Sequence, residues 1–368
     1  MSSARDIRPT WAEIDTGAYS RNIDAIVQRL PAGCRLVPVL KADGYGHGAV
    51  ELAKRCTPDR VGMIAVALLE EGLDLRHAGI TLPLLVLGPL SETQIATALD
   101  EKITAGVIGP EELESAARVA KDRDIAIHLK LDSGMGRMGL IDEDLPRVAE
   151  IIRSSPRLRI DALYTHFANA SDPGDPYTQQ QIERFDRMVR ALEELGVRAP
   201  KHHLANSAAT VRGVGIADYV RVGIALFGVE VVEGWRLEPV MRWRTEIARL
   251  KNLPANSGIG YGVTFRTSRP SRIATLPVGY ADGYDRLLSN NADVLIRGCR
   301  SPVVGRVSMD LITVDVTDVP GVALGDEVVL LGSQDGERIT ADELAQRTGT
   351  ISYEVFCGVS KRVPRFYR

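Results

Sequence analysis

The stretch CRLVPVLKADGYGHGA, from Cys34 to Ala49, decides how the rest of the chain is interpreted. Residues 35–40 form an almost continuous apolar run, which is typical of a strand covered on both faces. Lys41 follows this run directly, and three glycines loosen the backbone just beyond it. An apolar pattern in residues 50–56 then predicts a helix. A lysine at a strand end usually does no more than improve solubility, so the rest of the chain must decide whether Lys41 is catalytic.

Short apolar runs alternate with amphipathic stretches over the next two hundred or so residues. A short strand at residues 11–15 and a helix at residues 19–30 precede this region, and helical periodicity returns at residues 111–120, 145–152 and 180–195. Eight strand-like runs end near Lys41, Ala67, Gly88, Gly109, Asp132, His166, Asn206 and Gly223. Alternating strands and helices imply a parallel sheet, and eight such units predict a (β/α)8 TIM barrel. Eight units over a little more than 200 residues match such a barrel better than an open, doubly wound sheet.

The pattern changes at about Leu237, where helical periodicity gives way to β-rich segments between turn residues. The strand-like segments are residues 272–277, 293–296, 312–316 and 327–331, with one helix-like piece at 341–346. We therefore predict a barrel domain at residues 1–236 and a mostly antiparallel β domain at residues 237–368. The first ~10–15 residues are candidates for packing with the β domain.

Charge and composition narrow the range of partners. The 368 residues carry a net charge of −3 with no basic stripe, so we expect neither nucleic acid nor a membrane surface as a partner. The N-terminus has no apolar leader segment, and no run approaches the roughly 18 apolar residues that span a bilayer, so we expect a cytoplasmic protein. The four cysteines are scattered without paired spacing, so we assign them neither a disulfide nor a metal.

Polar residues follow several of the predicted barrel strands, at the end where barrel enzymes place their active sites. The polar residues are Lys41, Tyr45, Lys130, Asp132, Arg137, His166, Asn206, Ser207 and Arg221, and the last loop adds the backbone of Gly223 and Ile224. The loops after the last two strands match the usual phosphate site of such barrels. A lysine together with a phosphate site suits pyridoxal 5′-phosphate, which has an aldehyde at one end and a phosphate at the other.

Nine motifs in order give the chain a resemblance to the alanine racemase family of fold-type III pyridoxal phosphate enzymes. They are VLKADGYGHG, KLDSGMGRMG, THFANA, ANSAAT, RVGIALFG, GIGYGVTF, GYADGY, GRVSMD and SYEV. The resemblance extends over essentially the whole chain. It implies an enzyme that interconverts L-alanine and D-alanine, the latter a cell-wall precursor, and it leaves a biosynthetic or a catabolic role open.

The resemblance also implies a role for each matching residue. Lys41 would form the internal aldimine, and Arg221 would hydrogen-bond the ring nitrogen. The phosphate would be held by Tyr45, Ser207, Gly223, Ile224 and Tyr353, with His166 near the ring face and Asn206 beside the cofactor. Arg137 and Met309 would meet the substrate carboxylate. Lys130 matches a lysine that many members carry as a carbamate, which would orient Arg137. Tyr261, Tyr280, Met309 and Asp310 would enter the site from the neighbouring subunit, so the resemblance implies a homodimer with shared sites.

Racemisation needs two acid/base groups on opposite faces of the substrate, and Lys41 and Tyr261 would supply them. Arg221 does not give up a proton in practice, so the ring nitrogen would stay neutral, which favours racemisation over decarboxylation or transamination. A fold-type III decarboxylase is a weaker alternative, because the chain lacks a CESGD motif and an acidic residue in place of Arg221. A second alternative is a non-catalytic pyridoxal phosphate carrier built from the barrel alone. The predicted β domain, which contains Tyr261, argues against it. A racemase of serine, or of a broader range of amino acids, stays open.

Overall fold

The structure is a computed structural model that describes residues 8–368. The chain divides into two compact units, which we describe separately. The barrel unit contains Tyr19–Gly44 and Ala49–Glu238. The β unit contains the N-terminal residues up to Ala18, the short segment Tyr45–Gly48, and Pro239–Arg368. Within residues 8–368, none of the helices combines the length and apolar character that crossing a membrane requires.

The barrel unit is built on eight parallel strands. They are β2 (Arg35–Pro38), β3 (Ile64–Val66), β4 (Leu84–Val86), β5 (Ile103–Val107), β6 (Ile125–Lys130), β7 (Leu158–Tyr164), β8 (His202–His203) and β9 (Tyr219–Val222). Strands β3 to β8 pair in sequence order, and β2 pairs with β9. Bridges from Leu36 to Val61 and from Val39 to Ala65 continue the sheet from β2 towards β3. This parallel, curled sheet confirms the predicted barrel, and each predicted strand end lies within about three residues of the observed one.

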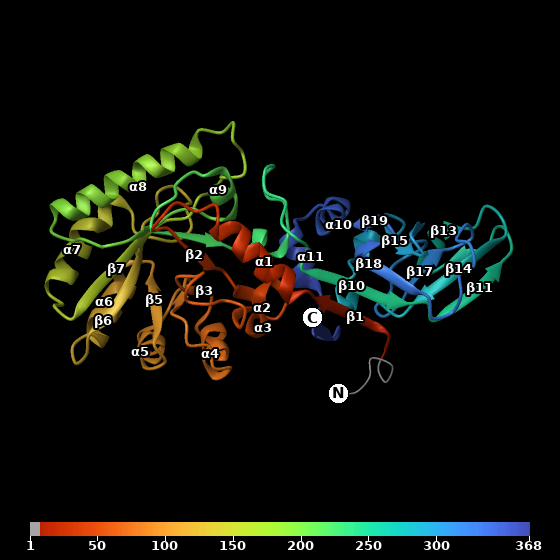
Figure 1. The fold of residues 1–368 in the computed structure, drawn as a ribbon, viewed down its shortest axis with the longest axis horizontal. Coiled ribbons are helices and arrows are strands. Elements are labelled where there is room, and N and C mark those ends of the chain that lie inside the picture. The colour runs from red at the N-terminus through yellow and green to blue at the C-terminus, as the bar shows by residue number, and fades with distance from the viewer. Residues whose placement is uncertain (1–7) are drawn as a thin grey trace. The chain divides into compact units, whose positions relative to one another are not determined.

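Helices follow most of these strands and surround the sheet (Figure 1). They are α1 (Thr16–Val27), α2 (Lys41–Tyr45), α3 (Ala49–Ala53), α4 (Leu69–His77), α5 (Glu92–Asp100), α6 (Pro110–Val119), α7 (Leu145–Arg153), α8 (Tyr177–Glu194) and α9 (Ser207–Arg212), with 3-10 turns η2 (Asp142–Asp144) and η3 (Ile224–Phe227). The longest, α8, buries one face that includes Phe185, Met188 and Leu192. Such one-sided burial is the reason for the apolar periodicity that predicted these helices.

Among its described residues, the β unit contains three sheets, which are mostly antiparallel. The largest has the strand order β16-β15-β18-β10-β1-β20, with β19 added to β18; the others are β11-β14-β17 and the hairpin β12-β13. The strands are β1 (Thr10–Ile14), β10 (Met241–Glu246), β11 (Arg249–Leu253), β12 (Gly258–Ile259), β13 (Phe265–Arg266), β14 (Ser271–Leu276), β15 (Asp293–Ile296), β16 (Cys299–Pro302), β17 (Ile312–Asp315), β18 (Glu327–Gln334), β19 (Glu337–Ile339) and β20 (Arg365–Tyr367). The described residues of this unit also form helices α10 (Ala341–Thr348) and α11 (Ser352–Gly358) and the 3-10 turns η4 (Tyr261–Val263), η5 (Tyr280–Asp282) and η6 (Arg286–Leu288).

The N-terminal strand β1 is an internal member of the largest sheet. It pairs antiparallel with β10, with Ala12 opposite Trp243, and parallel with β20 at the C-terminus. Figure 1 shows β1, in red, beside β10. A strand flanked on both sides has its backbone groups satisfied, so residues 10–14 and the C-terminal strand β20 are both tied into this unit.

Candidate active site

Lys41 begins a turn with left-handed backbone just after β2. Residues 42–44 have φ between 52° and 60°, a conformation that costs energy for residues with a side chain. Two carboxylates hold the turn: Glu71 accepts from the Ala42 N–H (2.5 Å), and Asp43 accepts from the Ala49 N–H (2.8 Å). The Lys41 side chain is exposed. Strained backbone that is held in place by its surroundings is a frequent feature of functional sites. The sequence did not point to Glu71.

Arg221 is a buried arginine on β9, only 3% exposed. Its Nη1 donates to the carbonyl oxygen of His203 (2.8 Å) and to Nδ1 of the same residue (2.8 Å). Its Nη2 donates to the carbonyls of Thr165 (2.6 Å) and Leu204 (3.1 Å) and to Nδ1 of His166 (3.2 Å). A guanidinium can only donate, so both histidine nitrogens are acceptors here. The surroundings of Arg221 are therefore complementary to a donor and would reject a carboxylate. Burial lowers the pKa of Arg221 to about 10, so it stays charged at neutral pH.

A second layer of buried rings lies behind Arg221, and no sequence pattern pointed to it. His203 stacks on Tyr164 with ring centroids 4.7 Å apart, and its Nε2 lies 3.1 Å from Nδ1 of His128. Burial, assisted by the charge of Arg221, holds the pKa of His203 well below its usual range, so the ring is neutral. Because its Nδ1 accepts from Arg221, its proton must be on Nε2 and is donated to His128. This arrangement fixes the tautomer of His203 and the orientation of the arginine.

Several cations lie within electrostatic range of one another at the strand ends. Burial, with the charges of Arg137 and Arg221, lowers the pKa of Lys130 to about 8. Burial and the charges of Arg221 and Lys130 also lower the pKa of His166 well below its usual value. Lys41 contributes in the same direction to both shifts. The structure thus brings together five residues that the sequence predicted for the site, and the excess of positive charge suits an anionic ligand.

Asp132 organises the loop that carries Arg137. Its Oδ1 accepts from the N–H groups of residues 134, 135 and 136 at 2.9, 2.7 and 3.1 Å, and its Oδ2 accepts from the Arg137 N–H at 3.2 Å. Asp132 is itself buried at the end of β6. The sequence placed Asp132 among the polar residues of the rim, and the structure gives it the more specific task of setting the backbone position of Arg137.

The loops after β8 and β9 form one hydrogen-bonded corner. Asn206 caps α9, since its Oδ1 accepts from the Ala209 N–H (3.0 Å). The buried hydroxyl of Ser207 accepts from the Gly223 N–H (3.0 Å), which joins the two loops. Ile224 begins the 3-10 turn η3 directly afterwards. In this bond the Ser207 oxygen is the acceptor, so its hydroxyl proton can still be donated to a further acceptor.

The remaining predicted residues lie in the β unit. Tyr45 and Tyr353 form one pair, with ring centroids 5.8 Å apart in an edge-to-face arrangement. Burial raises the pKa of Tyr353. The second group is exposed: Tyr261 is 73% exposed, Met309 53% and Tyr280 43%. Large apolar side chains gathered at a surface are typical of an interaction face.

These features define a barrel protein with its site at the carboxyl ends of the strands, joined to a β-rich unit that carries exposed aromatic residues. Family models described as "Alanine racemase, N-terminal domain" and "Alanine racemase, C-terminal domain" match residues 14–231 and 240–367. The chain therefore belongs to the alanine racemase family of isomerases, which use pyridoxal phosphate.

Full-length relatives and solved structures agree with this assignment. The chain is 45% identical to the alanine racemase of Symbiobacterium thermophilum, over 98% of this chain and 97% of that protein. It is 40% identical to that of Halothermothrix orenii, over 99% and 98%. The crystal structure of alanine racemase from Bacillus anthracis with bound L-Ala-P superimposes with a TM-score of 0.92 at 36% identity, covering 98% of this chain and 95% of that one. The structure from E. faecalis gives 0.91 at 34% identity, covering 98% of each chain.

Proposed function

We propose that this chain interconverts L-alanine and D-alanine with bound pyridoxal 5′-phosphate, using Lys41 on one face of the substrate and Tyr261 of the partner subunit on the other. The observation that carries the proposal is the buried Arg221. Its hydrogen-bonding neighbours are all acceptors, and its charge acts on Lys130 and His166 together with the charges of Lys41 and Arg137. A permanently charged donor at this place suits an aromatic ring nitrogen that must stay unprotonated.

The residues present fit the cofactor. Lys41 offers a primary amine at a strand end, and the buried Ser207 hydroxyl retains a proton for a phosphate oxygen. When bound, the cofactor supplies an aldehyde that takes up amino groups and a ring that acidifies the substrate α-proton. The residues that would hold it are Lys41, Tyr45, His166, Asn206, Ser207, Arg221, Gly223, Ile224 and Tyr353.

Arg221 would control which reaction occurs. Its guanidinium donates to the ring nitrogen and keeps its own protons, because its pKa of about 10 lies far above that of a pyridine nitrogen. Negative charge at the substrate α-carbon is then poorly delocalised and short-lived. Return of a proton to that carbon outpaces the loss of carbon dioxide or transfer of the amino group.

Two proton carriers complete the reaction. The Lys41 amine takes a proton from the α-carbon on one face, and the phenol of Tyr261 serves the other face. A free phenol has a pKa of about 10, so Tyr261 needs neighbouring positive charge to act as a base, and Arg137 is the candidate. Arg137 and Met309 hold the substrate carboxylate, and the loop that carries Arg137 is fixed by Asp132.

A homodimer would bring these groups together. The exposure of Tyr261, Tyr280 and Met309 supports a surface that a second copy of the chain covers. Lys130 is a candidate for carbamylation, because a buried lysine with a pKa of about 8 is about half in the nucleophilic amine form at that pH and has several cations around it. A carbamate would replace one cation of the group by an anion that orients Arg137.

A chiral assay tests the proposal. Purified protein loaded with pyridoxal phosphate is incubated separately with L-alanine and D-alanine, and the enantiomeric ratio is followed to equilibrium. We expect both reactions to converge on a 1:1 mixture, as mirror-image forms require. Lys41→Ala should lose both the turnover and the absorbance of covalently held cofactor. A protein that converts neither enantiomer, or a Lys41→Ala variant with full turnover, would refute the proposed function.

A further inference from the structure

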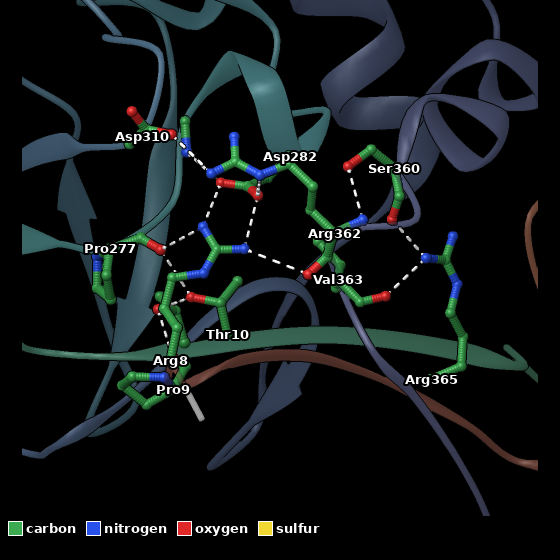
Figure 2. A network of polar contacts seen from close by, with 12 residues as sticks. Arg8, Pro9, Thr10, Pro277, Asp282, Asp310, Ser360, Arg362, Val363 and Arg365 are labelled. Atoms are coloured by element: carbon green, nitrogen blue, oxygen red, sulfur yellow. Dashed lines mark hydrogen bonds and ion pairs between the residues drawn. The ribbon is translucent and has the colours of Figure 1, made fainter. Parts of the chain in front are cut away.

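Asp282 is a fully buried carboxylate in the β unit, on the 3-10 turn η5 that also carries Tyr280 (Figure 2). Arg8 binds it with two hydrogen bonds, from Nη1 to Oδ2 (2.7 Å) and from Nη2 to Oδ1 (2.6 Å). The Gly279 N–H donates to Oδ2 (3.0 Å), and Nε of Arg362 lies 3.7 Å from Oδ1. A buried carboxylate is costly unless it is paired and hydrogen-bonded, and this one is both.

Arg362 extends this network to the surface. Its Nη2 donates to Oδ1 of Asp310 at 2.7 Å, so one guanidinium bridges a buried carboxylate and an exposed one (Figure 2). The segment that carries Arg362 is itself fixed, because the Ser360 N–H donates to the Asp282 carbonyl (3.0 Å) and Arg365 donates to the carbonyls of Ser360 and Val363. The position of Asp310 is therefore tied to the interior of the unit.

Residues 305–310, which we call the 305–310 loop, support the turns of both exposed tyrosines. On one side, the Tyr280 and Ala281 N–H groups donate to the carbonyls of residues 308 and 309, both at 3.0 Å. A Cβ on Gly279 would lie 2.3–2.5 Å from the same backbone, so this contact needs glycine. On the other side, Gly260, which precedes Tyr261, packs against the backbone of residue 306, with its Cβ position 3.3 Å from the amide nitrogen.

Besides these backbone contacts, side chains anchor the loop at two places. Near its start, the amides of Gly305 and Val307 donate to Asn290 (2.6 Å) and Ser289 (3.0 Å). At its end, Asp310 is held by Arg362. Loss of the arginine would leave the end that carries Met309 to its backbone hydrogen bonds, which are those with Tyr280 and Ala281 and that from the Ser308 N–H to the Leu311 carbonyl (3.0 Å), while the start stays tied by side chains.

We propose that Arg362 is a positioning residue for alanine binding, which acts through Asp310 and sets the place of Met309 and of the Tyr280 turn. The buried carboxylate of Asp282 holds the guanidinium of Arg362 from the interior of the unit. This inference rests on the proposed function, which assigns Met309 to the substrate carboxylate. Because Arg362 and Asp310 are each about half exposed, at 47% and 55%, their ion pair adds little to stability, and its effect should be on geometry.

The proposal is tested by comparing the steady-state kinetics of the Arg362→Gln enzyme with those of the wild-type enzyme, each loaded with pyridoxal phosphate. We expect KM for alanine to rise about twofold to fivefold while kcat stays near the wild-type value. Asp310→Asn should behave in the same way, and the double variant should be no worse than Arg362→Gln alone, because Arg362→Gln already removes the ion pair with Asp310. Arg362→Lys retains a charge that can reach one carboxylate and should recover part of the loss.

The matched control is Arg297→Gln. Arg297 lies in the same unit, is 48% exposed and forms an ion pair with Asp326 at 3.2 Å. Arg297→Gln therefore removes a comparable ion pair at a place away from the 305–310 loop. Its KM should equal that of the wild type. An unchanged KM in Arg362→Gln, or the same rise in Arg297→Gln, overturns the proposal.

Hydrogen exchange gives a readout that does not depend on turnover. The Tyr280 and Ala281 amides should exchange several-fold faster in Arg362→Gln than in the wild type and in Arg297→Gln, since their acceptors lie on the released loop. Unchanged exchange at these amides contradicts the positioning role. If the wild-type enzyme itself does not racemise alanine, the proposed function fails, and the exchange experiment still decides whether Arg362 orders the loop.

Discussion

Replacing Arg221 by glutamine removes the donor at the centre of the barrel site. At least three acceptors lose the hydrogen bond that Arg221 supplies: the carbonyls of Thr165 and Leu204, and Nδ1 of His203. An acceptor left unsatisfied in a buried place costs about 1–3 kcal/mol, so the variant should lose at least ~3 kcal/mol of unfolding free energy. That is a large share of the roughly 5–15 kcal/mol available to a folded protein. Arg221→Lys should lose less, because an ammonium can still donate to some of these acceptors.

Urea unfolding followed by circular dichroism measures this loss in the protein without cofactor. Arg212→Gln is the control, because Arg212 lies in the same unit and donates to the carbonyls of Ala170 (2.9 Å) and Asp172 (3.2 Å) nearer the surface. The control should change the unfolding free energy by no more than ~0.5 kcal/mol. Equal unfolding midpoints for Arg221→Gln and Arg212→Gln would refute the view that Arg221 is held by buried acceptors.

Three further predictions concern the same site. In buffer free of carbon dioxide, the unfolding free energy of the wild type should rise relative to that of Lys130→Met, by up to about 3 kcal/mol, between pH 8 and the ordinary lysine pKa of 10.5. The reason is that, in this pH range, the unfolded chain still binds the proton that the folded Lys130 has released. A difference in urea unfolding that does not depend on pH would contradict this. Asp132→Ala should raise KM for alanine about tenfold by loosening the Arg137 loop, whereas Asp172→Ala, which loses one amide contact in an exposed loop, should leave KM unchanged. Tyr261→Phe should retain the cofactor absorbance but lose racemisation by about 100-fold or more, and a chiral assay that shows undiminished turnover would exclude Tyr261 as a base.

The strand and helix patterns predicted most of the fold because they depend on local spacing. The barrel strands, the Asp293–Ile296 strand and the helix at Ala341 all lie where apolar periodicity places them. Helix α1 was predicted three residues too late at both ends, because the carboxylate of Asp15 accepts from the Ala18 N–H (2.7 Å) and the helix begins at Thr16. The helix α11 was missed, because its SYEV motif was interpreted only as a family signature.

Long-range pairing could not be predicted from local patterns. Strand β1 lies between β10 and β20, which are more than two hundred residues away in the sequence. The roles of His203, Asp282 and Arg362 also escaped notice, because each depends on a buried or bridging partner that no spacing rule reveals. The division of the chain at residues 236 and 237 stays a prediction, as do the individual roles of the site residues.

Subunit exchange between two inactive variants tests the shared site most directly. Lys41→Ala and Tyr261→Phe homodimers are mixed in equal amounts under conditions that allow exchange, and racemisation is measured before and after. A hybrid dimer would have one site with Lys41 from one chain and Tyr261 from the other, so roughly a quarter of all sites should become competent after complete exchange. Recovery of about that share of wild-type activity is the result we predict. If each site drew both residues from one chain, every site would keep a defect, and absence of recovery after proven exchange would contradict the shared site.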